Sequence, residues 1–388
     1  MSDQNPVFIP GPTNIPESIR KACDMPTLDH RSPVFRTILT PALDGVKKVM
    51  KAENAEMVVF PSSGTGGWEA AISNTLSAGD RVLAAQQGMF SQKWIDMCER
   101  HGLDMIVHEV EWGEACPVEK YAETLKADTD HAIKAVLVTH NETATGVLSD
   151  VAAVRRALDE AGHPALLYVD GVSSIGSMDF RFDEWQVDLA IAGSQKGFML
   201  PAGLSIVAVS KKALATMAQA ELPRYYFDIP DMIANLAAGG YPYTPVVGML
   251  NGLAKSCEML LDEGLDNVFA RHHRIAEGVR LAVKAWGLEL CAVRPEIYSD
   301  SVTAIVVPEG FDGAELVNHA AVKYGVSFGG GLGKVAGKVF RIGHLGSMTD
   351  AMALLGLATA EMAMADLGYP VELGSGVAAA QEYYRTTA

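Results

Sequence analysis

The sequence predicts an α/β protein with a large domain built on a mainly parallel sheet and a smaller C-terminal α+β domain. Short apolar runs alternate with helix-like segments between residues 57 and 209, and this alternation is typical of βαβ units whose strands are covered on both faces. The length of 388 residues also exceeds the size at which one hydrophobic core usually stops growing. We therefore expect an N-terminal arm at residues 1–20, the large domain at residues 21–267 and the small domain at residues 268–388.

The N-terminal segment is rich in proline. Residues 1–35 contain six prolines, and proline fixes φ and lacks a backbone N–H group. We predict a mostly extended and irregular segment that packs across another surface.

Seven apolar runs predict the strands of the large sheet. They are residues 57–60, 81–85, 105–110, 135–139, 166–170, 189–192 and 204–209. The helical segments between the earlier strands are residues 67–76, 91–101, 118–125 and 151–161.

The pattern changes after the last of these strands. Residues 222–245 are rich in aromatic residues and prolines and predict a long connection, which in a compact enzyme is more often functional than idle. A helix is predicted at residues 267–286, where apolar residues recur on one face. The small domain then continues with strands at residues 302–307 and 339–342 and helices at residues 314–324 and 351–367.

Composition limits the partners and the compartment. The formal charge of −16 would repel nucleic acid and anionic membranes over most of the surface, so we expect neither as a partner. No long apolar run lacks charge, and the N-terminus lacks the basic start and apolar core of a signal peptide. The five cysteines are scattered without a CxxC pair, and no histidine spacing indicates a metal. We therefore expect a soluble, cytoplasmic protein with reduced thiols and no metal site.

Lys196 is the strongest candidate for chemistry. It follows the apolar run at residues 189–192, and a lysine amine forms an imine with an aldehyde cofactor and moves a proton once the substrate displaces it. Taken alone, a lysine after a strand is better interpreted as a surface residue. Other stretches of the sequence change that interpretation.

Asp170 and the loop at residues 62–67 are candidates for two further contacts, one with a pyridine nitrogen and one with a phosphate. Asp170 ends a strand at the place where open α/β sheets bind ligands, and a carboxylate there would keep a pyridine nitrogen protonated; a turn or helix N-cap is an equally good interpretation of this residue alone. The loop Ser-Ser-Gly-Thr-Gly-Gly opens a helix, whose free N–H groups and dipole bind phosphate, with the hydroxyls of Ser63 and Thr65 as extra donors. It lacks the third glycine of a dinucleotide motif.

Arg341 completes the set. It lies on the predicted strand at residues 339–342, and its planar guanidinium matches a carboxylate, although an exposed strand arginine is as good an interpretation of the residue alone. Tyr241 and Thr244 lie in the long connection, where their hydroxyls could reach a phosphate or simply pack in the loop. A lysine, an aspartate, a phosphate loop and a late arginine together indicate pyridoxal phosphate.

Six motifs in the same order closely resemble the class V pyridoxal-phosphate-dependent aminotransferases. Within that class the chain is similar to the serine/alanine/aspartate:glyoxylate aminotransferase group over residues 8–376. This resemblance implies a fold-type I enzyme with a seven-stranded sheet. The motifs are PGPTNIP at residues 10–16, SGTG at 63–66, THNETATG at 139–146, VDGVSS at 169–174, GSQK at 193–196 and FRIGHLG at 340–346.

The resemblance also implies the roles of individual residues. Lys196 would form the Schiff base with the cofactor, and Asp170 would bind the pyridine nitrogen. The remaining cofactor contacts would be Ser63, Gly64, Thr65 and Gln195 at the phosphate, Val172 against the ring, Thr143 near the ring hydroxyl and Phe90 stacked on the ring, where the family often has tryptophan. Tyr241 and Thr244 would reach the phosphate in the neighbouring subunit of a homodimer with shared sites, and Arg341 would bind the substrate α-carboxylate.

The activity implied is transfer of the amino group of a small L-amino acid to glyoxylate, giving glycine and a 2-oxo acid by a ping-pong mechanism. Aspartate is slightly favoured as the donor over serine, with a serine(alanine):glyoxylate or pyruvate aminotransferase as the alternative. Aspartate brings a second carboxylate, for which Arg31, with its neighbour His30, and His344 are the candidate cations.

Two other interpretations stay open. A lyase or cysteine desulfurase on the same fold would need a mobile cysteine in the small-domain loop, and residues 324–337 contain none. A non-catalytic oligomeric protein with this fold is the second, and the presence of Lys196, Asp170 and Arg341 together argues against it.

Overall fold

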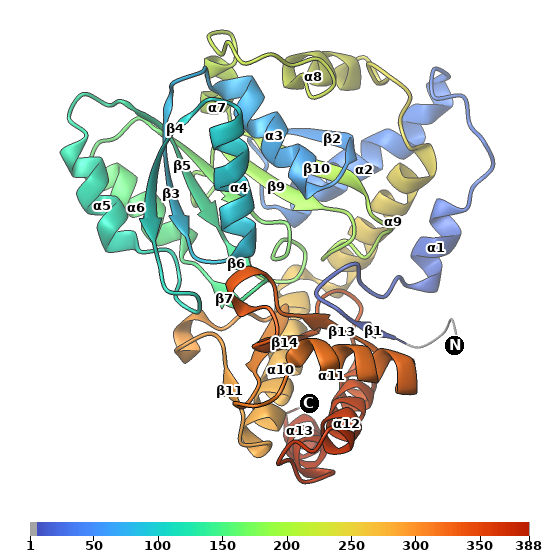
Figure 1. Cartoon of the computed structure of the whole chain (residues 1–388). Coiled ribbons are helices and arrows are strands. Elements are labelled where there is room, and N and C mark those ends of the chain that lie inside the picture. The colour runs from blue at the N-terminus through green and yellow to red at the C-terminus, as the bar shows by residue number, and fades with distance from the viewer. Residues whose placement is uncertain (1–5, 388) are drawn as a thin grey trace.

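The large sheet has seven strands in the order β2-β10-β9-β8-β5-β3-β4 (Figure 1). The computed structural model describes residues 6–387. Within this sheet β10 runs antiparallel to both of its neighbours, and the other pairs are parallel, so the predicted mainly parallel sheet is confirmed. The strands are β2 (Glu56–Ser62), β3 (Arg81–Gln86), β4 (Asp104–Glu109), β5 (Ile133–Thr139), β8 (Leu166–Asp170), β9 (Leu189–Gly193) and β10 (Gly203–Val209).

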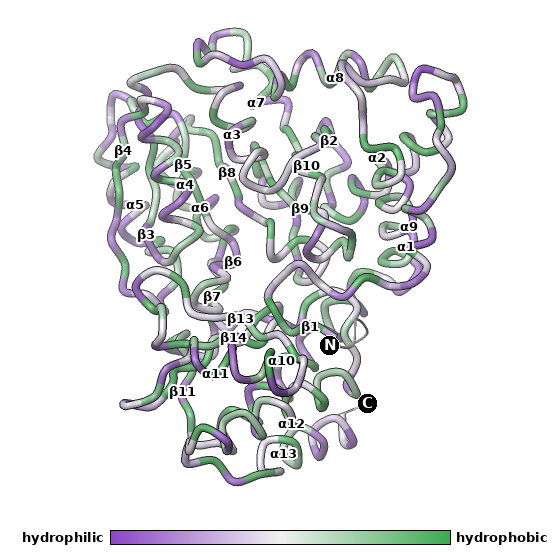
Figure 2. The backbone as a smooth tube through the Cα atoms, turned by 45° about the vertical axis from the view of Figure 1, so that its right-hand side comes forward, coloured by the Kyte–Doolittle hydropathy of each residue, from purple (hydrophilic) through white to green (hydrophobic). Residues whose placement is uncertain are grey.

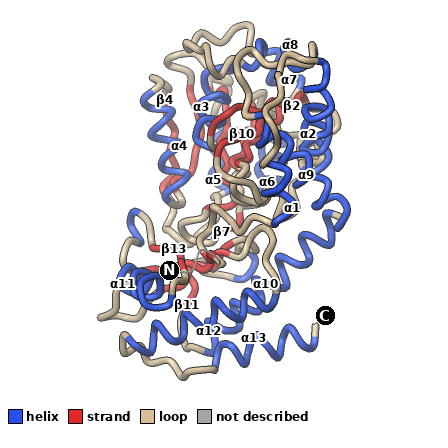
Figure 3. The backbone as a smooth tube through the Cα atoms, turned by 90° about the vertical axis from the view of Figure 1, so that its right-hand side faces the viewer, coloured by secondary structure: helices blue, strands red, loops and turns tan. Residues whose placement is uncertain are grey.

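Helices cover both faces of this sheet (Figure 3). Strands β8 and β9 are buried along their whole length, which explains their continuous apolar sequences. Along the helices the hydropathy alternates between hydrophobic and hydrophilic (Figure 2), as expected for helices with one buried face. The connecting helices are α3 (Gly64–Thr75), α4 (Met89–Arg100), α5 (Val118–Ala127), α6 (Val151–Glu160) and α7 (Lys211–Thr216).

The proline-rich N-terminal segment is less irregular than predicted. Residues Glu17–Cys23 form helix α1, which packs on α9 (Val247–Glu263). Pro16 precedes the first turn, where a missing N–H group costs nothing, and the buried Ile19 anchors the helix. Here proline marks the start of a helix rather than preventing one.

Several further helices of the described chain lie outside the predicted elements, and two of them contrast in their local sequence. Helix α2 (Arg36–Val49) packs against α9. Helix α8 (Ile229–Ala237) lies inside the predicted long connection, where the Asp228 side chain accepts the backbone N–H of Asp231 and a proline lies in the first turn.

The second sheet has five strands in the order β1-β13-β14-β12-β11. Its strand β1 (Val7–Phe8) pairs in parallel with β13 (Ser327–Gly330), so the start of the described chain joins a sheet built from its end. The other strands are β11 (Glu289–Leu290), β12 (Val302–Val306) and β14 (Val339–Gly343), and the helices are α10 (Leu265–Ala285), α11 (Gly313–His319), α12 (Asp350–Asp366) and α13 (Ser375–Thr386). The domain limits at residues 20 and 267 stay a prediction.

A two-stranded hairpin, β6 (Asn141–Glu142) and β7 (Val147–Leu148), lies between the two sheets (Figure 1). None of the helices in the described part of the chain has the length and hydropathy needed to cross a membrane.

Candidate active site

The carboxyl ends of β2, β8 and β9 meet at one edge of the large sheet, as they must when strands are parallel. Val172, just after β8, fills the space between two glycines. A Cβ atom added to Gly64 would overlap Val172, and one added to Gly193 would lie 3.3 Å from the same side chain and 2.9 Å from Oε1 of Gln195. The structure therefore brings the predicted loop, Val172 and the Gln195-Lys196 pair together.

The loop after β2 has the form expected of an anion site. Ser63 is the N-cap of α3, and its carbonyl accepts the N–H groups of Gly66 and Gly67 (3.0 and 3.3 Å). The first N–H groups of the helix lie outside the helical ladder and carry the positive end of its dipole, and Ser63 and Thr65 are exposed beside them. Across Val172, Oε1 of Gln195 is buried without a hydrogen-bond partner; rotating the amide would present its NH₂ group to a phosphate at the same place.

Lys196 follows β9 and is partly buried. Its Nζ donates a hydrogen bond to the carbonyl of Pro10. Burial, assisted by the positive charge of Arg341 and opposed by Asp170, lowers the pKa of the lysine to about 8. A lysine with this pKa has a substantial neutral fraction near pH 7.5 and is suited to nucleophilic and base chemistry.

Asp170 ends β8 and is 4% exposed. Its Oδ1 accepts the backbone N–H of Val172 (2.9 Å). Burial, assisted by the nearby Glu142 and opposed by the Val172 hydrogen bond and Lys196, raises the pKa of this carboxyl to about 7. A cationic partner would favour the ionised form of such a group, so the site fits the protonated ring nitrogen of pyridoxal phosphate.

Arg341 lies on β14, in register with Ala304 and Gly329 of the neighbouring strands. Its Nε donates to the carbonyl of Gly330 (2.9 Å) and its Nη1 to the carbonyl of Thr143 (3.0 Å). Burial lowers the pKa of the guanidinium to about 10. Within residues 6–387 no ion pair is recorded for this buried cation, which leaves it suited to a ligand carboxylate.

Thr143 and Phe90 flank the same region. The hydroxyl of Thr143 donates to Oγ of Ser173 (2.7 Å). Ser173 lies three residues after Asp170, the last residue of β8. Phe90 is the second residue of α4, is half-buried, and donates its N–H to the carboxylate of Glu142 (3.1 Å). The ring position of Phe90 thus depends on a residue that the sequence analysis did not single out.

Glu142 is fully buried. Its carboxylate accepts the backbone N–H groups of Phe90, Ser91 and Ala144 at 3.0 to 3.1 Å, and a Cβ atom on Gly88 would overlap it. Burial raises its pKa. The signal that could have identified Glu142 from the sequence was its position inside the THNETATG motif.

Tyr241, Thr244 and Arg31 are not brought to Lys196 by any contact recorded in residues 6–387. The hydroxyl of Tyr241 donates to the carbonyl of Val59 in the same chain (2.8 Å), and Thr244 is exposed. Arg31 is also exposed, and its backbone N–H donates to Asp29 (2.9 Å).

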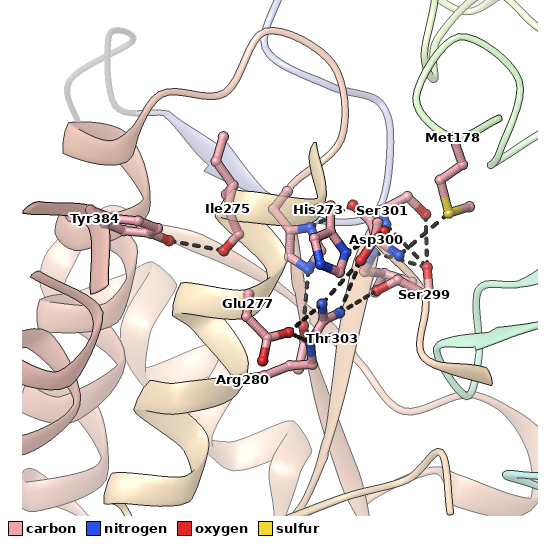
Figure 4. A network of polar contacts seen from close by, with 12 residues as sticks. Met178, His273, Ile275, Glu277, Arg280, Ser299, Asp300, Ser301, Thr303 and Tyr384 are labelled. Carbon is pink, nitrogen blue, oxygen red and sulfur yellow. Dashed lines mark hydrogen bonds and ion pairs between the residues drawn. The ribbon is translucent and has the colours of Figure 1, made fainter. Parts of the chain in front are cut away.

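His344 belongs to a separate polar network. Its Nε2 and Thr303 Oγ1 are 2.9 Å apart, and its Nδ1 donates to the carbonyl of Asp300 (3.0 Å). Figure 4 shows Arg280 and His273 of α10 turned toward Asp300 in this network. Burial lowers the pKa of His344 to about 3. Both ring nitrogens of His344 are thus engaged by groups of the protein, and its role as a cation for a second carboxylate stays a prediction.

Comparison with known proteins gives concordant results. The aminotransferase class-V family matches residues 25–332. The chain is 69% identical to an L-aspartate–glyoxylate aminotransferase of Paracoccus denitrificans, covering 100% of this chain and 98% of that one, and 55% identical to a serine–glyoxylate aminotransferase of Hyphomicrobium methylovorum, covering 98% and 95%. The fold matches the crystal structure of pyridoxamine–pyruvate aminotransferase from Mesorhizobium loti with a TM-score of 0.92 and 30% identity over 100% of this chain and 99% of that one.

Proposed function

The chain belongs to the aminotransferase class-V family, and on this premise we propose that it transfers the amino group of a small L-amino acid, aspartate first, to glyoxylate. The products are glycine and a 2-oxo acid, and the cofactor is pyridoxal phosphate. The observation that carries the proposal is the convergence of Lys196, Asp170 and Arg341, three buried or partly buried charged groups with pKa values displaced by burial.

Pyridoxal phosphate supplies the aldehyde that takes the amino group and a ring that withdraws electrons from the α-carbon. The chain's own residues would do the rest. Nζ of Lys196 would hold the cofactor and move the α-proton, Asp170 would keep the ring nitrogen protonated, and Arg341 would bind the α-carboxylate. The loop at residues 63–65 and Gln195 would bind the phosphate.

Borohydride reduction tests the cofactor assignment. The purified protein should be yellow, and reduction should attach the cofactor to Lys196, as read by mass spectrometry of the peptide. A Lys196→Ala variant should lose the visible absorbance of the bound cofactor. Attachment at a different lysine would contradict the proposal.

The identity of the donor is supported by the relatives, because the aspartate–glyoxylate enzyme shares 69% of residues and the serine–glyoxylate enzyme 55%. The test mixes the cofactor-loaded protein separately with aspartate, serine and alanine in the absence of acceptor and follows the loss of visible absorbance. We expect aspartate to react fastest. A faster reaction with serine or alanine would favour the serine(alanine):glyoxylate alternative.

Arg31 is our proposed contact for the second carboxylate of aspartate. Its side chain is exposed and has no recorded partner within residues 6–387, so it is available to a site across a subunit interface. Arg31→Ala should lower kcat/KM for aspartate and leave that for serine unchanged, with the exposed Arg20→Ala as the control. An equal loss with both donors would show that Arg31 does not determine specificity.

We also propose that the chain forms a homodimer with two active sites, each built from both subunits. We place this dimer in the cytoplasm. Tyr225 is 92% exposed, and the neighbouring Tyr226, itself 41% exposed, donates its hydroxyl to the carbonyl of Pro61 beside the phosphate loop. Exposed aromatic residues that border a ligand loop are typical of a surface that a partner covers. Free thiols at all five cysteines support a reducing compartment.

A further inference from the structure

Residues 9–13 form a segment, here called the strap, that runs between the second sheet and the loop after β9 that contains Gln195 and Lys196. On one side, a Cβ atom on Gly343 would lie 2.6 Å from the backbone nitrogen of Pro10, and one on Gly329 would lie 2.9 Å from its Cδ. On the other side, the N–H of Thr13 donates to the carbonyl of Gln195 (3.2 Å), and its hydroxyl donates to the carbonyl of Lys196 (3.3 Å). The strap is therefore fixed on both faces.

Two residues of this strap contact the lysine side chain itself. The carbonyl of Pro10 accepts the hydrogen bond of Lys196 Nζ. Gly11 has φ +104°, and a Cβ atom there would lie 2.5, 2.6 and 2.7 Å from Cδ, Nζ and Cε of Lys196. Only glycine leaves room for the lysine in this position.

An acceptor at this place has a chemical purpose. A buried amine without a hydrogen-bond partner is costly, and the Arg341 charge close by disfavours the protonated form. A carboxylate acceptor would hold the lysine as a cation. A neutral carbonyl orients the amine and still allows it to lose its proton and leave.

We propose that Pro10 and Gly11 are positioning residues for Lys196: the Pro10 carbonyl holds the amine whenever it is not joined to the cofactor, and Gly11 provides the space for its side chain. This inference rests on the proposed function, in which Lys196 is joined to the cofactor and released during each half-reaction. It gives a role to the PGPTNIP motif.

A double-mutant cycle on the cofactor-free protein tests the contact. Gly11→Ala should lower the unfolding midpoint more in wild type than in a Lys196→Ala background, because only in wild type must the new Cβ displace the lysine amine from the Pro10 carbonyl, whereas the backbone strain is the same in both. Gly79→Ala is the matched control: Gly79 also has a positive φ (+84°) but nothing lies within 4 Å of an added Cβ. It reports the cost of backbone strain alone. An equal loss from Gly11→Ala in both backgrounds would overturn the inference.

The second measurement reports on the amine. The cofactor-free protein is mixed with pyridoxal phosphate at several pH values, and the rate at which the visible absorbance appears is recorded. Gly11→Ala should slow capture about tenfold, because the displaced amine is no longer oriented toward the aldehyde, and should shift the pH profile to lower pH, because an amine that loses its acceptor gives up its proton more readily. Gly79→Ala should leave both unchanged, and an unaltered profile in Gly11→Ala would contradict the proposed role.

A failure of the proposed function can be distinguished from a failure of the inference about Pro10 and Gly11. If wild-type protein does not capture pyridoxal phosphate on Lys196, the proposed function fails. The stability cycle needs no cofactor, so it tests the contact between Gly11 and Lys196 independently.

Discussion

At the scale of single residues, burial shifts the pKa values of Lys196 and Asp170 in opposite directions. Each shift favours the uncharged form of the group. The pKa of the lysine falls to about 8 and that of the aspartate rises to about 7. The ligand would give each group a further partner: an aldehyde carbon for the amine and a cationic ring nitrogen for the carboxylate. The fold maintains this arrangement at a cost in stability.

Asp170→Asn should reveal that cost in the cofactor-free protein. The carboxyl has a folded pKa of about 7 and a reference value of 3.8, so the folded state retains a proton that the unfolded state releases between these values, and wild-type stability is lost as the pH rises through this window. The variant, which keeps an acceptor for the Val172 N–H, should be more stable than wild type at pH 8 by up to about 4 kcal/mol. Urea unfolding at pH 8, 6.5 and 5 should show this difference shrinking, and a constant difference would contradict it.

Arg341→Lys tests whether the shape of the cation matters as well as its charge. Lysine keeps the charge but loses the planar group that the carbonyls of Gly330 and Thr143 orient. KM for glyoxylate and for the amino donor should rise about 10- to 100-fold, while the absorbance of the bound cofactor stays unchanged. The exposed Arg81→Lys is the control for a general effect of the substitution. Unchanged KM values would remove Arg341 from carboxylate binding.

The sequence could single out Asp170 and Lys196 as candidates because they end or follow apolar runs, and the ends of such runs can be located. Arg341 lies in the middle of β14, and only the family motif around it pointed to that residue. Glu142 and Gly11 were missed because their roles depend on contacts with distant residues, 52 positions away for Glu142 and Phe90 and 186 for Lys196 and Pro10. The role of His344 as a candidate cation stays a prediction, and its burial and both of its partners depend on the tertiary fold.

At the scale of elements, the start of α4 depends on a carboxylate supplied by another strand. Gly88 at its N-cap has no side chain to accept the free N–H groups, and Glu142 of β6 accepts those of Phe90 and Ser91 instead. The close approach requires the missing Cβ of Gly88. This contact fixes the backbone of Phe90 and thereby the ring that we expect to stack on the cofactor.

Glu142→Gln should destabilise the protein by about 1 to 3 kcal/mol, the cost of leaving a buried hydrogen-bonding group unsatisfied. Both carboxylate oxygens accept N–H groups, so the NH₂ group of glutamine must face one of those donors. Asp150→Asn is the matched control, since Asp150 caps α6 through a single N–H of Ala153 (2.8 Å) at an exposed position, where asparagine is an equally good cap. Urea unfolding compares the two variants, and equal effects would exclude a special role for Glu142.

The helices missed from the sequence have two different physical origins. Helix α8 carries a cap signal, Asp228 followed by a proline in the first turn, which was obscured by the aromatic and proline content of its surroundings. Helix α2 contains Pro41, and its stability comes from packing against α9. Tertiary packing of this kind overrides local propensity and leaves no signal within a short window.

At the scale of the whole molecule, the residues of the candidate site come from both sheets and from the strap between them. Lys196 and Asp170 come from the large sheet and Arg341 from the second, and the Arg341 guanidinium reaches back to the carbonyl of Thr143. The predicted phosphate contacts Tyr241 and Thr244 do not join this assembly within the described chain. A second copy of the chain is therefore the proposed source of those two residues.

Hybrid dimers test whether the sites are shared. Lys196→Ala removes the amine that we propose to be catalytic, and Thr244→Glu would place a carboxylate against the proposed phosphate site from an exposed position that should tolerate it. Each variant alone should be nearly inactive. In a hybrid with shared sites, one site would contain both substitutions and the other would contain neither, so a refolded equimolar mixture should recover about a quarter of wild-type activity, since half of its dimers are hybrids. Thr244→Val mixed with wild type controls for the exchange itself. If each site lay within one subunit, every site would carry one defect and mixing would restore nothing, which would refute the shared site.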